Sequence, residues 1–413
     1  MILAIDVGGT KLAAGLVSRD GTVTGSRRVA TPQGADAETL WRTLIALVEP
    51  LAGHAEAVGV GCGGPMSWPD GEVSPLNIPG WRRFPLRARL AEQFPSLPVR
   101  LHNDAVCLAV AEHWLGAGRG SRDMLGMVVS TGVGGGLILG GRLAHGRTGN
   151  AGHIGHVVVE PHDGPRCTCG GHGCLEAVAR GPALTSWALA NGWHPNPRKP
   201  PAPVPAPITA QPNIAVGLGA AGGEPGWSAG THVRTAQRAG EGAPHANAAV
   251  GRVLTGSGPD GEGVAYREGR EAAGSGPDGE RVAFQEGREA AGSGLDGEGV
   301  AYREDREVTA RELAADALAG DPVAVRAMRR AGRALGVAIA SATHLCDLGL
   351  VTVGGGLAQA GEPLFGPLEE ALREHARMGF ARDIEVLPAA LGQDAGLVGA
   401  AALHLAADRY WPT

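Results

Sequence analysis

Residues 2–17 read ILAIDVGGTKLAAGLV, and this stretch decides the expected fold. An apolar run, a short Gly-Gly-Thr-Lys segment and a second apolar run predict two strands joined by a tight turn. A Walker A loop or a Rossmann fingerprint needs a helix directly after its glycines, whereas here a strand follows. The stretch therefore predicts a β-hairpin with a glycine turn and argues against both of those nucleotide-binding motifs.

The same layout returns in residues 124–139, which read MLGMVVSTGVGGGLIL. A strand runs into a Thr-Gly turn that we expect to extend through residue 136, and residues 137–139 continue as a strand. Two such units in one chain predict a duplicated domain. The remaining elements predict an α/β protein. Helices are expected at 36–51, 85–94, 105–115, 310–318, 323–345, 364–375 and 394–403, with Asp36 and Asp394 as N-caps, and strands at 57–61, 99–101, 348–353 and 384–388.

The glycine turns also suggest a chemistry. Each would present backbone N–H groups and hydroxyls to phosphate oxygens, and the glycines at 354–356 could let an adenosine pass. A single glycine turn in a hairpin is usually only a turn, but the set predicts ATP binding between two domains. Asp6 could hold Mg²⁺ through water, and Lys11 could add charge. The expected ATP contacts are Asp6, Gly8, Gly9, Thr10, Lys11, Thr131, Gly132, Gly134, Gly354 and Gly355.

The length and the net charge of the chain limit which kinds of partner it can bind. The chain has 413 residues, enough for two domains, and a formal net charge of −6. That charge argues against general binding to nucleic acids or membrane surfaces, because no basic excess is available for phosphates. No stretch reaches the roughly 18 apolar residues of a membrane span, and the N-terminus has no signal-peptide pattern. We therefore expect a cytoplasmic protein with small-molecule partners.

Residues 196–308 differ in composition from the rest of the chain. Proline-rich sequence leads into an 18-residue unit that occurs three times, beginning at Gly256, Gly274 and Gly292. Each copy has only one or two apolar anchors, too few to offset the entropy of ordering it. We predict a disordered or weakly ordered insertion, with a partner-binding or self-associating repeat as the alternative.

Asn103 and Asp104 stand where a predicted strand meets a predicted helix, the place where open α/β folds put ligand contacts. A hydroxyl that attacks a γ-phosphate benefits from a carboxylate that orients it and takes its proton. Asp104 is the candidate base, and Asn103 the candidate substrate clamp. A plain helix N-cap is the alternative for this pair.

Cys167, Cys169 and Cys174 follow a C-x-C-x4-C spacing, with histidines nearby. Three thiolates and one imidazole make a closed tetrahedral Zn²⁺ site, which is structural because it leaves no position for a substrate. His156 is favoured as the fourth ligand. The alternative histidines are His153, His162 and His172, and reduced buried thiols are the alternative to a metal site.

Together these motifs resemble the ROK family of sugar kinases and repressors. The residues that carry the resemblance are 6–11, 103–104, 131–136 and 155–176, in an order that is collinear over 1–192 and 309–405. The resemblance implies an actin-like, ribonuclease-H-like ATPase fold of two lobes, with ATP and Mg²⁺ in the cleft. It also implies phosphoryl transfer to a sugar hydroxyl, expected at O6, with Asp104 as the base.

The resemblance further implies sugar contacts and a domain organisation. The expected sugar contacts are Gly64, Asn77, Asn103, His153, His156 and Glu176. We expect a small lobe at 1–105 on which 396–413 packs back, a large lobe at 106–195 and 309–395 with the zinc site, and the insertion at 196–308. The family implies a homodimer or homotetramer.

Departures from the family pattern bear on the substrate. Most family kinases have glutamate at the position of His153, and the segment around it resembles bacterial N-acetylmannosamine kinases instead. An N-acetylmannosamine-type sugar is therefore favoured, with a glucokinase or a non-catalytic sugar-binding regulator as alternatives. A DNA-binding repressor is disfavoured because the first turn starts at Asp6. The spacing from His156 to Cys167 is one residue longer than usual, which leaves the histidine ligand open.

Overall fold

The computed structural model describes residues 1–195 and 308–411. Within them, the strands form two five-stranded sheets and one two-stranded sheet. Apart from its last residue, the insertion predicted at 196–308, with its three 18-residue repeats, lies outside the described residues.

The first sheet has the strand order β3-β2-β1-β4-β7. β1 pairs antiparallel with β2 and parallel with β4, so Ile5 lies opposite Ala14 on one side and Val60 on the other. Its strands are β1 (Ile2–Val7), β2 (Lys11–Val17), β3 (Val23–Ala30), β4 (Ala57–Cys62) and β7 (Val99–Asn103).

The second sheet repeats this plan with the order β10-β9-β8-β11-β12. Its first strand in the chain again pairs antiparallel with the next strand and parallel with a later one. The duplication predicted from the two glycine turns is thus confirmed by the strand order. Its strands are β8 (Met124–Val129), β9 (Val133–Leu139), β10 (Arg142–Leu143), β11 (Leu350–Gly354) and β12 (Glu385–Pro388).

The second glycine turn is shorter than predicted. β9 begins at Val133, so the glycines up to Gly136 belong to the strand and not to the turn. A Cβ at Gly136 would lie 2.8 Å from Cα of Val106 on the neighbouring helix. Glycine is needed there because helix and strand approach closely, and a glycine run was therefore a misleading sign of a turn.

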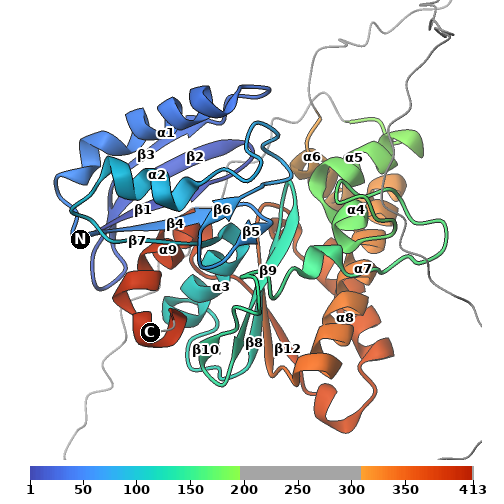
Figure 1. Cartoon of the computed structure of the whole chain (residues 1–413). Helices are drawn as coiled ribbons and strands as arrows, with labels where there is room; N and C mark the ends of the chain where they lie inside the picture. The colour runs from blue at the N-terminus through green and yellow to red at the C-terminus, as the bar shows by residue number, and fades with distance from the viewer. Residues whose placement is uncertain (196–307, 412–413) are drawn as a thin grey trace, which may run out of the picture. The chain divides into compact units, whose positions relative to one another are not determined.

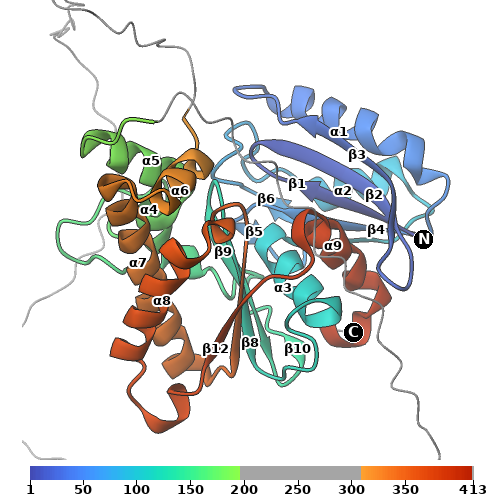
Figure 2. The ribbon, with the colours of Figure 1, turned by 180° about the vertical axis from the view of Figure 1, so that it is seen from behind.

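Two helices lie between the sheets. α3 (Asp104–Leu115) packs against β8 and β9, α9 (Ala395–Leu405) packs against β1 and β4, and the two helices pack against each other (Figures 1 and 2). Alternate residues of β1 face opposite ways, and Ala4 points towards α9 while Ile5 points away. The short α10 (Ala407–Tyr410) follows α9.

Other helices cover the remaining sheet faces. α1 (Ala37–Ala52) and α2 (Leu86–Gln93) share an apolar core with the first sheet, and the second sheet shares one with a larger group (Figure 1). That group is α4 (Leu175–Ala179), α5 (Gly181–Ala190), α6 (Ala310–Leu318), α7 (Pro322–Cys346) and α8 (Glu362–His375). None of the helices in the described parts of the chain is long and apolar enough to cross a membrane. The smaller elements are β5 (Met66–Ser67), β6 (Glu72–Val73), η1 (Ile154–His156), η2 (Leu357–Ala360), η3 (Gly379–Ala381) and η4 (Gly392–Asp394).

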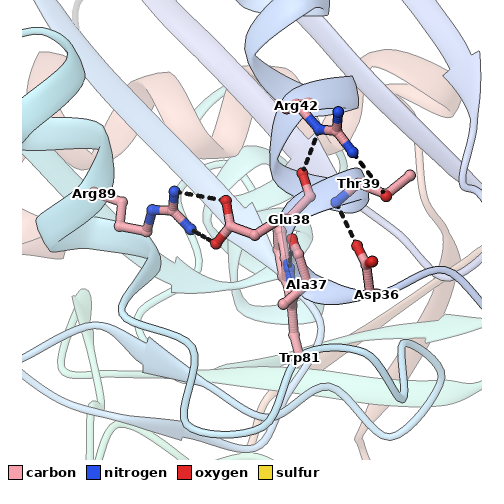
Figure 3. Close-up of polar contacts among 7 residues, drawn as sticks. All are labelled: Asp36, Ala37, Glu38, Thr39, Arg42, Trp81 and Arg89. Carbon is pink, nitrogen blue, oxygen red and sulfur yellow. Dashed lines mark hydrogen bonds and ion pairs between the residues drawn. The ribbon is translucent and has the colours of Figure 1, made fainter.

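The start of α1 shows how local sequence signals fit the packing (Figure 3). Asp36 accepts the backbone N–H of Thr39 at 2.7 Å, so the predicted N-cap is confirmed. Glu38 accepts two hydrogen bonds from Arg89 of α2, at 2.5 and 3.0 Å, and the indole of Trp81 donates to a backbone carbonyl of the first helical turn. These contacts tie α1 to α2.

Asp394 stands at the predicted N-cap position of α9, but its side chain does not cap the helix. Its side chain makes no capping hydrogen bond and instead accepts from Arg28 at 3.0 Å. Asp394 ends the 3-10 turn η4 with φ −94° and ψ −4°, whereas a capping side chain normally requires an extended backbone. The preceding turn therefore decides the conformation of this residue.

Candidate functional site

A cavity of about 660 Å³ lies where the glycine turns of the two sheets face each other. Every residue predicted to contact sugar or ATP lines it, from Asp6 in β1 to Gly355 after β11. The chain orders these residues far apart, but they come together because the ends of corresponding strands in the duplicated sheets meet there. A cavity of this size and polarity suits small-molecule ligands.

The first turn places Asp6 and Lys11 on one wall of this cavity. The turn closes through a hydrogen bond from the Gly8 N–H to the Lys11 carbonyl at 3.0 Å. A Cβ at Gly9 would lie 2.5 Å from the side-chain nitrogen of Asn77, so glycine lets Asn77 approach the turn. Burial raises the pKa of Asp6, and the positive charge of Lys11 partly opposes this effect. Asp6 offers the oxygen ligand that Mg²⁺ prefers beside a phosphate chain.

The second turn is held by Glu176 at the start of α4. One carboxylate oxygen of Glu176 accepts the backbone N–H of Val133 at 2.9 Å. The same oxygen lies 2.9 Å from the position that a Cβ would take at Gly132. Glu176, predicted as a sugar contact, thus also supports the turn that contains Thr131.

The third turn requires glycine for two reasons. Gly355 has φ +93°, and a Cβ there would collide with the backbone carbonyl of Val129 at the end of β8. The turn after β11 therefore lies close to the turn after β8. Gly354, Gly355 and Gly356 line the cavity on this side.

Asn103 and Asp104 have different roles at the start of α3. The side-chain oxygen of Asn103 caps α3 by accepting the N–H groups of Ala105 and Val106, at 3.0 and 3.3 Å. Oδ1 of Asp104 also accepts the N–H of Ala105, at 2.8 Å, while Oδ2 lies 3.9 Å from a Cβ position at Gly63. Asn103 is therefore the N-cap, and Asp104 presents its second oxygen towards the cavity.

The environment of Asp104 changes its acidity. Burial raises the pKa of Asp104 to about 7, with further contributions from the negative charges of Asp6 and Glu176. A carboxyl group with this pKa exchanges a proton near neutral pH, as general acid–base chemistry requires.

His153 points a buried nitrogen at the cavity. Its Nε2 has no hydrogen-bond partner among the described residues. Nε2 of His153 and Nδ2 of Asn103 each lie 2.9 Å from the position of a Cβ at Gly64. Burial lowers the pKa of His153, which favours its neutral imidazole. Buried polar atoms are normally hydrogen-bonded, and a ligand in the cavity is the natural partner of this nitrogen.

The cysteine motif forms a compact group beside the cavity. One ligand atom each from His156, Cys167, Cys169 and Cys174 lies within 4.8 Å of the others. The closest of these contacts include Nδ1 of His156 to Sγ of Cys167, at 3.6 Å. Three sulfur atoms and one imidazole nitrogen fit tetrahedral Zn²⁺. Among the candidate histidines, the geometry places His156 in this group, whereas Nε2 of His153 faces Gly64.

The cavity also contains residues that the sequence motifs did not single out. The clearest are Arg180, between α4 and α5, and Arg311 in the first turn of α6. Neither belongs to a glycine turn or to the cysteine motif. In the sequence, Arg180 is marked only by its position four residues after Glu176. That position points to the cavity only once the structure shows that α4 is short and ends before Arg180.

Comparison with known proteins shows which family this chain is similar to. The ROK family model matches residues 2–210 and 287–407. An N-acetylmannosamine kinase from Shigella flexneri is 44% identical over 190 residues, which cover 45% of this chain and 64% of that protein. The chain thus aligns with less than two thirds of the length of this curated relative.

Solved structures match over nearly the whole chain. A ROK family glucokinase from Streptomyces griseus, in complex with glucose and AMPPNP, has a TM-score of 0.64 and 29% identity, covering 97% of this chain and 98% of its own. A ROK hexokinase from Thermus thermophilus has a TM-score of 0.60 and 28% identity, covering 97% and 96%. The two-lobed, actin-like ATPase fold expected from the sequence is confirmed.

Proposed function

The chain belongs to the ROK family, and on this premise we propose that it is an ATP-dependent kinase that phosphorylates O6 of an N-acetylmannosamine-type sugar. One observation carries the proposal. Asp104 presents a carboxylate oxygen to a cavity that is bordered by the glycine turns of both sheets. A base between a candidate sugar site and a candidate phosphate site suits phosphoryl transfer to a hydroxyl.

The proposed reaction requires one proton transfer. The sugar hydroxyl oxygen attacks the γ-phosphorus, the bond from phosphorus to the ADP oxygen breaks, and Asp104 takes the hydroxyl proton. Although burial raises the pKa of Asp104 to about 7, about half of the carboxyl groups are still ionised at neutral pH and can take this proton. Most of the remaining catalysis is positioning and charge stabilisation.

The phosphate chain would lie between the two glycine turns. Backbone N–H groups around Gly8 and Gly132 would donate to its oxygens, and Lys11 would add a positive charge. Asp6 would hold Mg²⁺ directly or through water, and the ion would neutralise charge on the phosphates when bound. The structural support is that these residues line one cavity.

We assign the cysteine group a structural role. With four protein ligands, Zn²⁺ would have no open position for a substrate. The ligand His156 ends η1, the segment that begins directly after His153, and Cys174 is the N-cap residue of α4, which carries Glu176. A bound ion would therefore hold both pocket segments in place.

His153 favours the N-acylated substrate. Its neutral imidazole has an unpartnered buried Nε2, which could bond to a polar group of the sugar. A site built to hydrogen-bond one substrate group discriminates strongly against sugars that lack that group. The 44% identity to an N-acetylmannosamine kinase supports the same choice over the part that aligns.

Glucose is the second candidate substrate. The structure of the Streptomyces griseus glucokinase is 29% identical to this chain and covers 97% of it, which supports glucose as a candidate. His153 and the 44% identity over 45% of the chain support an N-acetylmannosamine kinase. The homodimer or homotetramer implied by the family, and the lobe boundaries given above, stay predictions.

A coupled ADP-release assay tests the proposal. The substrates are N-acetylmannosamine, N-acetylglucosamine, glucose, mannose, allose and fructose, each with wild type, His153→Glu and the exposed control variant His162→Gln. We expect the highest kcat/KM with N-acetylmannosamine. In His153→Glu, the ratio of kcat/KM values should shift at least tenfold towards glucose, and the control should match wild type. Absence of sugar-dependent ADP release with all six sugars would contradict the kinase proposal.

A further inference from the structure

Arg180 is a cationic side chain of the proposed active-site cavity, and it has no partner among the residues that the structure describes. It lines the cavity, and its Nε is buried with no hydrogen-bond partner. The described residues offer its guanidinium no ion pair either. Arginine carries five donors in a planar fork that matches phosphate or carboxylate oxygens. A buried donor without a partner is costly, so this arrangement suggests an anionic ligand.

The backbone fixes where Arg180 lies. The N–H of Arg180 donates to the Glu176 carbonyl at 3.1 Å, and the N–H of Gly181 donates to the Ser130 carbonyl at 2.8 Å. Ser130 directly precedes Thr131 in the second glycine turn. Its Oγ also lies 3.8 Å from a Cβ position at Gly356 in the third turn. Arg180 therefore belongs to the side of the cavity formed by the second and third turns.

That side is separate from two of the candidate sugar contacts, although a third, Glu176, supports the second turn. His153 and Asn103 approach Gly64 in the first half of the chain. Lys11, the cation anticipated from the sequence, comes from the first sheet, whereas Arg180 follows α4 beside the second sheet. Cations thus reach the cavity from both halves of the fold.

Arg311 adds a second charge on the same side. A Cβ at Gly181 would lie 3.0 Å from Cβ of Ala310, so the first turn of α6 lies against the start of α5. Arg311 is the next residue, is exposed, and lines the cavity. The two arginines therefore come from adjacent backbone segments, one half-buried and one at the solvent-exposed rim.

We propose that Arg180 binds the phosphate chain of the nucleotide donor and that Arg311 strengthens this binding from the rim. The proposal rests on the kinase function proposed above, and it adds a nucleotide-binding residue outside the three glycine turns. A phosphate oxygen would accept from the guanidinium fork of Arg180, while Lys11 would act from the opposite side. Phosphate is favoured over a sugar carboxylate because Arg180 lies beside the second and third turns.

Titration calorimetry without sugar tests this binding directly. The probes are adenosine, ADP and inorganic tripolyphosphate, and the variants are Arg180→Ala, Arg180→Lys and Arg311→Ala. Arg326→Ala, an exposed arginine of α7 outside the cavity, is the matched control. For Arg180→Ala we expect Kd for ADP and tripolyphosphate to rise about tenfold or more, because a charge-assisted hydrogen bond is lost, while Kd for adenosine stays the same.

The other variants sharpen the result. Arg180→Lys should keep part of the affinity for ADP and tripolyphosphate, since it retains the positive charge but loses the planar fork of donors. This variant also tests the proposal if Arg180→Ala does not fold. Arg311→Ala should have a smaller effect because its charge is more exposed to solvent and salt. An equal loss for adenosine and ADP would overturn the proposal, as would unchanged Kd values in both Arg180 variants or no ADP and tripolyphosphate binding by wild type.

The outcome is independent of turnover. A protein that binds ADP through Arg180 but phosphorylates no sugar would contradict the kinase proposal and support the role of Arg180. A protein that phosphorylates sugar, but whose Arg180 variants bind nucleotide as wild type does, would support the kinase proposal and contradict the role of Arg180.

Discussion

The side chain of Glu112 accepts the backbone N–H of Leu391 at 2.9 Å and thereby links α3 to the chain segment after β12. Glu112 is fully buried, and its other oxygen accepts the N–H groups of Ala390 and Ala117, at 3.0 and 2.8 Å. Neighbours of Leu391 on both sides line the cavity. One helix thus begins with the candidate base Asp104 and, in its last turn, holds a wall of the cavity.

Replacing Glu112 with glutamine should loosen this wall. The amide NH₂ group of glutamine would face a backbone N–H group that bonds to a carboxylate oxygen in the wild type. This buried N–H group would therefore lose its acceptor. We expect the free energy of unfolding to fall by about 1–3 kcal/mol, as measured by urea denaturation. In steady-state kinetics, KM for ATP should rise more than KM for the sugar. Glu369→Gln, at an exposed position of α8, is the control, and equal changes in both KM values would argue for a purely structural role.

Asp104 should give the proposed kinase activity a pH dependence near neutrality. Only the ionised carboxylate can take the hydroxyl proton, and burial raises its pKa to about 7. We therefore expect kcat/KM for the sugar to fall as the pH is lowered through 7. Asp104→Asn should lower kcat by about 10²- to 10⁴-fold, whereas the exposed control variant Asp383→Asn should not. A flat profile between pH 6 and 8 would speak against Asp104 as the base.

The same substitution should increase stability at high pH. Because burial raises the pKa of Asp104 above its value in the unfolded chain, ionising the folded protein costs free energy, and wild-type stability should decline as the pH rises from about 4 to 7. Asp104→Asn stays neutral and avoids this cost. At pH 8 the variant should be more stable by roughly 2–4 kcal/mol, and the difference should vanish near pH 4. Thermal unfolding at several pH values measures this, and a variant less stable than wild type at pH 8 would contradict it.

The cysteine group should bind one Zn²⁺ per chain. Elemental analysis of the purified protein checks the stoichiometry. Because a structural ion holds the folded form, removing it with a chelator, or making Cys169→Ser, should lower the unfolding temperature. Cys346→Ser, at a half-buried cysteine outside the group, should bind zinc as wild type does. A metal-free wild type with unchanged unfolding temperature would rule out the structural role.

Gly64→Ala should separate sugar binding from nucleotide binding. The added methyl group would lie 2.9 Å from side-chain nitrogens of both His153 and Asn103, so one of them must shift. We expect KM for the sugar to rise at least tenfold while Kd for ADP stays near the wild-type value. Gly53→Ala is the control, because a Cβ there meets no atom within 4 Å. An unchanged sugar KM in Gly64→Ala would place the sugar elsewhere.

Much of the secondary structure followed from local patterns. The helix predicted at 310–318 has those bounds in the structure, because a Thr309–Glu312 capping box starts it and a glycine follows its end. β3 was missed because it is an exposed edge strand whose polar residues show no alternation. Asp394 stands at the predicted N-cap position, but its side chain does not cap the helix, because a preceding 3-10 turn sets its backbone conformation.

The sequence by itself determined the duplicated α/β plan, the glycine turns and the motifs of the candidate site, since these depend on local spacing and residue type. Only the tertiary structure decided which groups are buried and what they face. It raised the pKa of Asp104 and joined Glu112 to Leu391. It also left Nε2 of His153 and Nε of Arg180 without partners among the described residues. Such properties arise from contacts between segments far apart in the chain, and no local pattern encodes them.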